Sequence, residues 1–216
     1  ERVTLQQTIC REGTTVLTDR QNLLLQPGES RTVSFRYCVD SPALWSPENP
    51  NLYTSTMQVL EGEEELDREE TGFGIRTLSI DAAHGVRING QTVKLRGACI
   101  HHDNGILGAA TLPDAEERRI RQLKEAGFNA IRSSHHPAGR ALLDACDRYG
   151  VLVMDELSDV WNVRKNPYDY ALYFEQDWKP TIQKMVAKDY NHPSVILYCV
   201  GNEISEAGSE SGAETN

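Results

Sequence analysis

Short apolar segments alternate with amphipathic segments over the second half of the chain, and this alternation constrains the fold more than any other feature. The amphipathic segments have apolar residues at helical spacing, whereas the apolar segments have the length of buried strands. Strands are expected at 93–99, 129–133, 151–154 and 195–200, and helices at 114–126, 138–149 and 173–189. Continuous apolar strands between helices are typical of a parallel sheet covered by helices. The second half is therefore predicted to be an α/β structure.

Local signals mark the ends of several of these elements. Asp114 and Glu117 have the spacing of a capping box at the start of the first helix, and Gly150 is placed to end the second helix. Asn89-Gly90 is a strong two-residue turn signal, and it is expected to join strands at 86–88 and 92–95 in a hairpin.

The first 80 residues show alternation of period two instead. Within 31–40 the apolar side chains from Val33 to Val39 alternate with polar ones, and the pattern continues at 53–59. Such alternation predicts antiparallel strands with one buried face. Four or five strands are fewer than the seven or so of an immunoglobulin-like sandwich. We therefore predict an incomplete β-sandwich over 1–80, with Trp45 in its core.

Each expected parallel strand runs directly into polar residues of catalytic types. The four endings are His101-His102-Asp103, the segment 132–136, Asp155-Glu156 and Asn202-Glu203. Parallel strands end at one edge of a sheet, and in a (β/α)8 barrel that edge carries the active site. The general polarity of loops would explain one such ending, but it explains four of them poorly.

Glu203 is the best candidate for a general acid or base. It follows the apolar run 195–201, so we expect a low-dielectric surrounding that raises its pKa toward the range of a general acid. Asn202 is placed to hydrogen-bond a substrate hydroxyl. Asp155 and Glu156 form a second acidic site, but one of them is equally expected to pair with Arg132 on the neighbouring strand.

The four clustered histidines have a different interpretation. Adjacent histidines on an extended segment point to opposite faces, so at most one of His101 and His102, and one of His135 and His136, faces the pocket. These side chains suit sugar hydroxyls better than a metal, because no metal-ligand spacing is present. No metal and no cofactor are expected. Trp161 follows the third strand and is placed to stack on a sugar ring.

Charge and cysteine content exclude several classes of partner. The chain has 32 acidic and 22 basic residues, a net charge of −10, which repels nucleic acid and anionic lipid. Its charge-free stretches are shorter than the roughly 20 residues of a membrane-spanning helix. Neither nucleic acid nor membrane is expected as a partner. The five single cysteines favour a reducing compartment, and both a cytoplasmic and a periplasmic location remain possible.

Six strings in this order resemble glycoside hydrolase family 2, in its β-galactosidase branch. They are LWSPENPNLY (44–53), FGIRTLSI (73–80), LRGACIHHDNGILGAA (95–110), NAIRSSHHP (129–137), DRYGVLVMDE (147–156) and HPSVILYCVGNE (192–203). The resemblance implies a jelly roll, an immunoglobulin-like sandwich and a (β/α)8 barrel, which hydrolyse terminal β-glycosides with retention. In this chain the sandwich would occupy 1–80 and the first half of the barrel 81–216.

The resemblance also implies roles for single residues. Glu203 resembles the acid/base of the family, and Asn202 resembles its partner for the sugar 2-hydroxyl. Residues expected around the sugar are His101, Asp103, Arg132, His135, Asp155 and Trp161. Some members bind magnesium through a Glu and a His after the third strand, where this chain has Val160 and Asn162, so we expect no magnesium site.

The nucleophilic glutamate of the family ends the seventh barrel strand, so we expect this chain to be an internal fragment, inactive alone, of a homo-oligomeric protein. The alternatives within the family are a β-glucuronidase and a β-mannosidase. A hydrolase of internal polysaccharide bonds is disfavoured by the sandwich. A non-catalytic module for carbohydrate binding or dimerisation would bind sugar without turnover.

Overall fold

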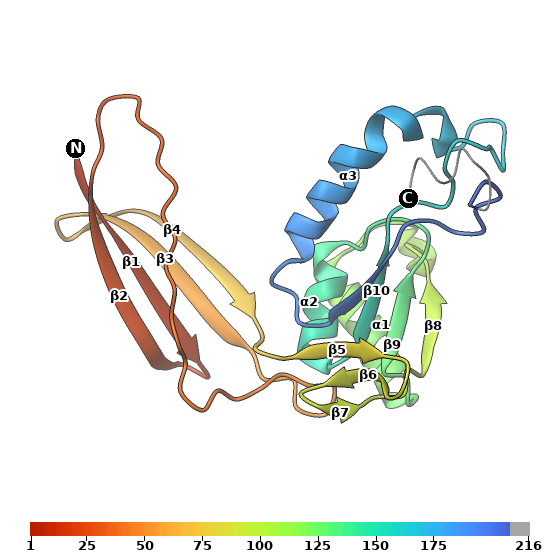
Figure 1. Cartoon of the computed structure of the whole chain (residues 1–216), viewed down its shortest axis with the longest axis horizontal. Coiled ribbons are helices and arrows are strands. Elements are labelled where there is room, and N and C mark those ends of the chain that lie inside the picture. The colour runs from red at the N-terminus through yellow and green to blue at the C-terminus, as the bar shows by residue number, and fades with distance from the viewer. Residues whose placement is uncertain (208–216) are drawn as a thin grey trace.

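A computed structural model describes residues 1–207, which fold into an antiparallel part and an α/β part (Figure 1). The antiparallel sheet has the order β2-β1-β3-β4. Its strands are β1 (Arg2–Arg11), β2 (Thr14–Leu24), β3 (Tyr53–Glu61) and β4 (Glu64–Phe73). A small antiparallel sheet follows, made of β5 (Leu78–Asp81), β6 (Gly85–Ile88) and β7 (Gln91–Thr92). The domain boundary predicted at residue 80 falls within β5 and stays a prediction.

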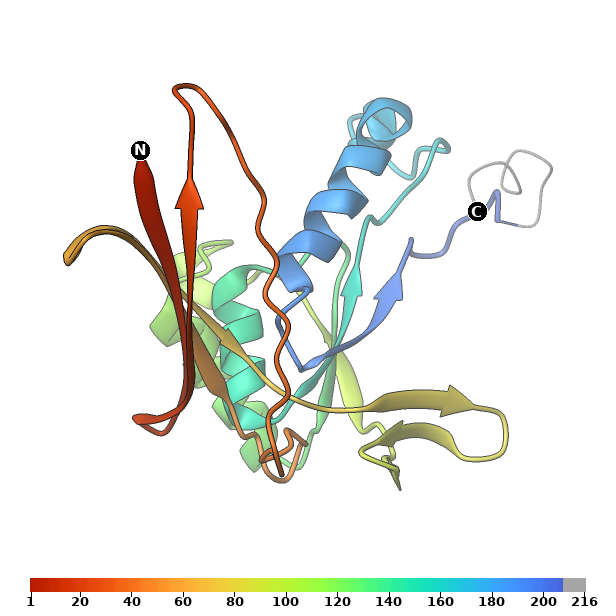
Figure 2. The ribbon, with the colours of Figure 1, turned by 60° about the vertical axis from the view of Figure 1, so that its left-hand side comes forward.

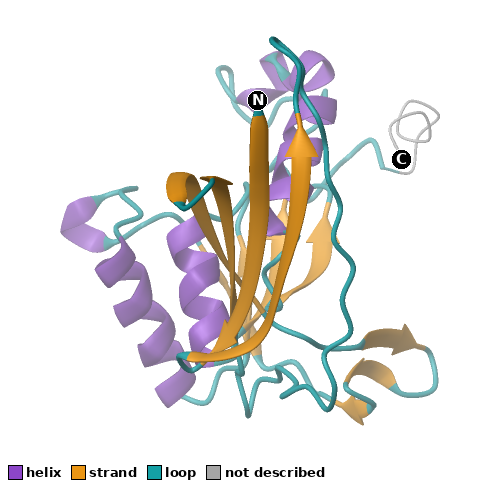
Figure 3. Ribbon diagram, turned by 90° about the vertical axis from the view of Figure 1, so that its left-hand side faces the viewer, coloured by secondary structure: helices purple, strands orange, loops and turns teal. Residues whose placement is uncertain are grey.

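The strand predicted at 31–40 is wrong. Residues 25–44 form the first part of the long connection between β2 and β3, and Figure 3 draws this connection as loop along its whole length. The predicted alternation is present in the burial, because Val33, Phe35, Tyr37 and Val39 are half-buried while their neighbours are exposed. A strand also needs a neighbouring strand for its backbone hydrogen bonds, and no described strand pairs with this segment. Figure 2 shows the segment beside the sheet rather than within it.

The α/β part has the predicted alternation of strands and helices, on a parallel sheet of order β11-β10-β9-β8, but the strand predicted at 93–99 begins only at Gly97. Its strands are β8 (Gly97–Ile100), β9 (Ala130–Ser133), β10 (Leu152–Glu156) and β11 (Val195–Cys199), and its helices are α1 (Pro113–Glu125), α2 (Arg140–Tyr149) and α3 (Phe174–Asp189). Short 3₁₀ turns precede α1 and α3, at Gly105–Leu107 and Tyr170–Leu172. Among the described residues, no helix is long and apolar enough to cross a membrane.

Helix α1 begins differently from the prediction, whereas α2 ends as predicted. Pro113 occupies the first position of α1, where its missing N–H is no loss, and Leu112 at the N-cap makes no side-chain capping bond. The capping box of Asp114 and Glu117 is therefore wrong, although Asp114 still lies in the first turn, where the helix dipole favours a carboxylate. Gly150 ends α2 in the left-handed conformation with φ of 67°.

The two faces of the parallel sheet differ. On one face, Ile131 and Val153 pack against Ile120 of α1 and against Leu142 and Cys146 of α2. On the other face, one row of paired residues crosses the sheet as Cys99, Arg132, Met154 and Leu197. This row helps to line an open groove of about 280 Å³. Arg132 therefore projects from the face that the helices leave uncovered.

Trp45 is fully buried, but its place is not the predicted one. It packs with Ile88 and with Ala130, Leu152 and Ile196 at the starts of three parallel strands, and its Nε1 donates to the carbonyl of Asp147 at 2.9 Å. Trp45 thus belongs to the core at the amino-terminal end of the barrel sheet. The part of the connection before β3 that carries Trp45 passes beneath that end of the sheet. It joins the two parts of the chain.

Candidate active site

Glu156, at the end of β10, organises the carboxyl edge of the sheet. Its side chain is fully buried, its Oε2 accepts a hydrogen bond from Arg132 Nε at 2.5 Å, and its Oε1 lies 2.5 Å from His135 Nδ1. Glu156 lies two positions after Met154, so it shares the uncovered face with Arg132. Of the two acidic residues considered as the partner of Arg132, Glu156 fills that role and Asp155 does not.

Asn202, which follows β11, is held at both ends of its amide. Its Oδ1 accepts from Arg132 Nη2 at 3.1 Å, and its Nδ2 donates to Asp159 Oδ1 at 2.9 Å. Lys165 Nζ also donates to Asp159 Oδ1. Partial burial alone would raise the pKa of Asp159, but the hydrogen bonds from Lys165 and Asn202 outweigh it and lower that pKa. Asp159 therefore stays ionised and fixes which way the Asn202 amide points.

The two histidines of each adjacent pair take part in different ring contacts, as the prediction of opposite faces requires. The rings of His101 and His135 meet edge to face, with centroids 5.2 Å apart, and the rings of His102 and His136 meet separately at 4.2 Å. His135 belongs to the set with Arg132 and Glu156, so His101 lies at the same edge of the sheet. Burial and then the neighbouring His136 lower the pKa of His102.

The loop after β8, which carries His101 and Asp103, is tied to α1 by residues that the sequence analysis did not single out. Arg119 Nη1 donates to the carbonyls of His101 at 2.8 Å and Asp103 at 3.2 Å. Arg119 is paired in turn with the fully buried Glu116, at 2.8 Å. The side chain of Asp103 is exposed, and its Oδ1 accepts from the N–H of Gly105.

Glu203 lies beside this set, but without the burial expected for it. Its side chain is exposed, and within residues 1–207 its carboxylate makes no hydrogen bond or ion pair. It lines a hollow of about 240 Å³ together with Lys165 and Trp161. Its φ of 48° lies in the left-handed region, which is uncommon for a residue with a side chain. Glu203 thus has a carboxyl with no partner among the described residues, directly after Asn202 in the chain.

Asp155 and Trp161 do not take the places expected for substrate-binding residues. Asp155 alternates with Glu156 along β10, so its buried carboxylate faces the helices, where Oδ1 accepts from Ala138 N at 2.8 Å and Oδ2 lies 3.5 Å from Lys188 Nζ. Trp161 is only 3% exposed, stacks on Phe174 and donates to the carbonyl of Val200. A ring packed in this way has no open face for a sugar.

Asp155 should make the stability of the protein depend on pH. Burial, together with the nearby Asp189 carboxylate, raises the pKa of Asp155 to about 7, against 3.8 normally. The folded state then binds more protons than the unfolded chain between about pH 4 and 7, so this group lowers stability as the pH rises through that window.

The unfolding free energy of Asp155→Asn should lack this loss. We therefore expect the difference in unfolding free energy between Asp155→Asn and the wild type to rise by roughly 2–4 kcal/mol, in favour of the variant, as the pH increases from 4 to 7. Urea unfolding at several pH values measures this change. Glu63→Gln, which alters an exposed carboxylate in a turn, is the control. Its unfolding free energy should change with pH as that of the wild type does. If the unfolding free energies of Asp155→Asn and the wild type change with pH in the same way, the raised pKa assigned to Asp155 is contradicted.

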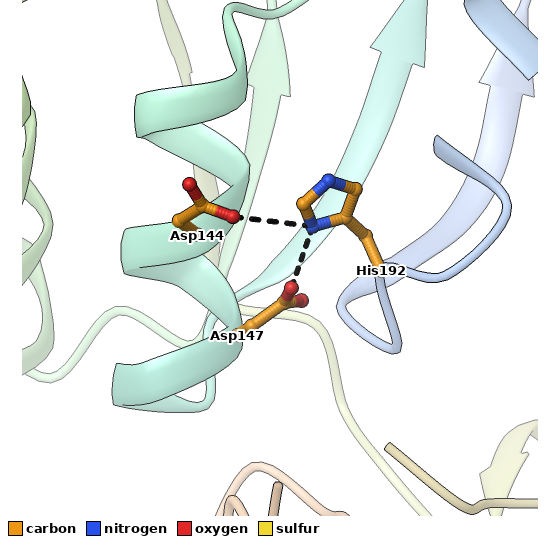
Figure 4. A group of neighbouring side chains, drawn as sticks. All are labelled: Asp144, Asp147 and His192. Carbon is orange, nitrogen blue, oxygen red and sulfur yellow. Dashed lines mark hydrogen bonds and ion pairs between the residues drawn. The ribbon is translucent and has the colours of Figure 1, made fainter. Parts of the chain in front are cut away.

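One group of described residues has ligand atoms close enough to hold a metal ion, and it lies away from this edge. It consists of Asp144 and Asp147 on α2 and His192 before β11 (Figure 4). His192 Nδ1 lies 2.6 Å from Asp147 Oδ2, and Asp147 Oδ1 accepts from Ser194 N at 3.0 Å. These contacts link the end of α2 to the start of β11. Near the carboxyl edge of the sheet, the two positions considered above for magnesium ligands hold Val160, which is buried, and Asn162, which is exposed.

Two family models match the chain. Residues 82–213 match the model described as "Glycosyl hydrolases family 2, TIM barrel domain", and residues 1–76 match the model described as "Glycosyl hydrolases family 2". Together with the structures below, these matches confirm the predicted fold class, an immunoglobulin-like sandwich followed by strands of a (β/α)8 barrel.

Individual proteins match over most of the chain. The β-galactosidase BoGH2A of Bacteroides ovatus is 42% identical over 204 residues, which are 94% of this chain and 24% of that protein. A putative β-glucuronidase of Formosa agariphila is 40% identical over 76% of this chain and 16% of its own length. The chain thus spans a quarter or less of these relatives.

Solved structures match over the whole described fold. A glycosyl hydrolase family 2 member from Bacteroides cellulosilyticus superposes with a TM-score of 0.93 at 43% identity, and the match covers 100% of this chain and 28% of that one. Bacteroides uniformis β-glucuronidase 2, covalently bound to cyclophellitol-6-carboxylate aziridine, superposes with a TM-score of 0.84 at 31% identity over 99% of this chain and 26% of its own.

Proposed function

The chain belongs to glycosyl hydrolase family 2, and from this premise we propose that the whole protein is a retaining exo-β-glycosidase that hydrolyses terminal β-galactosides. The observation that carries the proposal is the arrangement at the carboxyl edge of the parallel sheet. There Arg132, His135 and Asn202 form one hydrogen-bonded set around Glu156, and the free carboxyl of Glu203 lies directly after Asn202.

The roles of the residues follow from their hydrogen-bonding capacity. Glu203 donates a proton to the departing oxygen in the first step and, as a carboxylate, activates water in the second. The Asn202 amide has two N–H donors, of which one is used by Asp159, so the other is available for a sugar hydroxyl. We assign Arg132, His135, His101 and Asp103 to the surroundings of the terminal sugar.

A retaining mechanism also needs a nucleophilic carboxylate about 5–5.5 Å from the acid/base. Glu156 does not suit this role, because both of its oxygens are engaged by Arg132 and His135. Asp155 does not suit it either, because it faces the helices. We therefore place the nucleophile on a later strand of the eight-stranded barrel, of which the described residues supply four strands.

The choice of galactose is supported by the printed name of the Bacteroides ovatus relative, which aligns over 94% of the chain. β-Glucuronidase is the second candidate, because the Formosa agariphila relative at 40% identity has that putative name. A homo-oligomeric state and the lack of nucleic acid and membrane partners stay predictions.

A panel of nitrophenyl β-glycosides tests this proposal on the whole protein. We expect kcat/KM for the galactoside to exceed that for the glucuronide and the mannoside by at least about 100-fold, because a sugar that leaves buried polar groups unpaired is rejected strongly. Preference for the glucuronide would overturn the galactose assignment. Sugar binding with no turnover of any glycoside would favour the non-catalytic module.

A further inference from the structure

Lys165 lies in the loop after β10 and reaches back to the segment that carries the candidate acid/base. Its Nζ donates to the backbone carbonyl of Asn202 at 2.7 Å and to the backbone carbonyl and Oδ1 of Asp159, both at 2.9 Å. An ammonium group has three N–H donors, so all of them are used. The side chain is 29% exposed, which makes this a contact at the rim of the site.

The carbonyl that Lys165 contacts belongs to the peptide group between Asn202 and Glu203. A hydrogen bond to this oxygen restricts the rotation of that peptide plane, and the plane sets the direction in which Glu203 leaves the backbone. Glu203 has a positive φ of 48°, a conformation that persists in a residue with a side chain only when its surroundings hold it. Lys165 supplies one such contact.

Asp159 completes the arrangement. Its Oδ1 accepts from both Lys165 Nζ and Asn202 Nδ2, so one carboxylate connects the residue that holds the backbone with the amide expected to bind substrate. Asn202 is thereby fixed at three points, since Arg132 also donates to its Oδ1. Lys165 and Glu203 moreover line the same hollow.

We propose that Lys165 and Asp159 are positioning residues, which hold the Asn202–Glu203 segment so that the Glu203 carboxyl delivers its proton to the departing oxygen. The proposal rests on the proposed function, in which Glu203 is the acid/base. Neither side chain is required to touch the substrate, and the effect passes through the backbone of Asn202.

Lys165→Met in the whole protein tests the proposal. A displaced acid slows the first step most for substrates with poor leaving groups, so we expect kcat/KM for lactose to fall about 100-fold and kcat/KM for nitrophenyl galactoside to fall less than about 10-fold. Lys165→Arg, which keeps the charge and the donors, should recover most of the loss. Asp159→Asn, which keeps Oδ1 but removes the ion pair, should act in the same direction with a smaller loss.

Lys184→Met is the matched control, because Lys184 is exposed on α3 and makes no hydrogen bond or ion pair among the described residues. It should leave both rates unchanged. If Lys165→Met lowered kcat/KM equally for lactose and nitrophenyl galactoside, or did not lower it at all, the positioning role would be overturned while the proposed function stands. A wild-type protein that hydrolyses no β-glycoside would instead overturn the proposed function, and this inference with it.

Discussion

Glu203→Gln in the whole protein should lower kcat/KM for lactose by about 1,000-fold, and should lower the first chemical step on nitrophenyl galactoside far less. The departing sugar of lactose is an alkoxide that needs a proton from Glu203, whereas a nitrophenolate departs almost without one. The second step needs the same residue as a base for water. The activated substrate should therefore give a fast burst of nitrophenolate followed by slow turnover, which stopped-flow absorbance measures.

Glu175→Gln is the control for this prediction, because it makes the same change at an exposed position on α3. It should leave both substrates unaffected. If Glu203→Gln lowered kcat/KM equally for lactose and nitrophenyl galactoside, the proton donor would lie elsewhere.

Glu156→Gln should reduce stability and activity together, and should affect both substrates alike. Glu156 is fully buried and holds both Arg132 and His135, so its neutral replacement leaves the Arg132 charge without its partner. Breaking a buried ion pair costs about 3–5 kcal/mol. Arg132 and His135 are 29% and 23% exposed, so we expect about 2–3 kcal/mol in the unfolding free energy. kcat/KM should fall by roughly 100-fold, because two side chains that we propose to bind the sugar lose their positions.

Glu117→Gln provides the matched control. Glu117 also pairs with an arginine, Arg148 at 2.9 Å, but both side chains are more than 40% exposed. Such a surface pair contributes at most about 1 kcal/mol. Urea unfolding of the two variants compares the buried pair with the exposed one. Equal destabilisation would contradict the role assigned to Glu156.

The sequence predicted the α/β part well because short strand-like segments alternate with segments that have apolar residues at helical spacing. The strand expected at 195–200, for example, is a continuous apolar run that follows the helix expected at 173–189. Once the strands are parallel, their carboxyl ends meet, so Arg132, Glu156 and Asn202 had to approach one another. The histidine pairs also separate into two ring contacts, but His102, His135 and His136 lie in bends after the strands rather than on extended backbone.

Other features depend on a choice that the sequence leaves open. A shift of one residue in β10 would exchange the faces of Asp155 and Glu156, so the pattern alone did not decide which of them meets Arg132. The segment 31–40 has the alternation of a strand, but pairing depends on neighbours far along the chain. Lys165 and Asn202 are 37 residues apart, and their contact depends on how a loop folds back.

The role of Glu203 as acid/base is the central claim, and azide tests it most directly. Whole protein with Glu203→Gln is incubated with nitrophenyl β-galactoside and sodium azide, and the product is identified by NMR. Azide needs no general base, so it should restore the second step and yield galactosyl azide with the β configuration. The wild type, whose base activates water, should give mainly galactose. No acceleration by azide, or galactose as the only product of Glu203→Gln, would contradict the assignment.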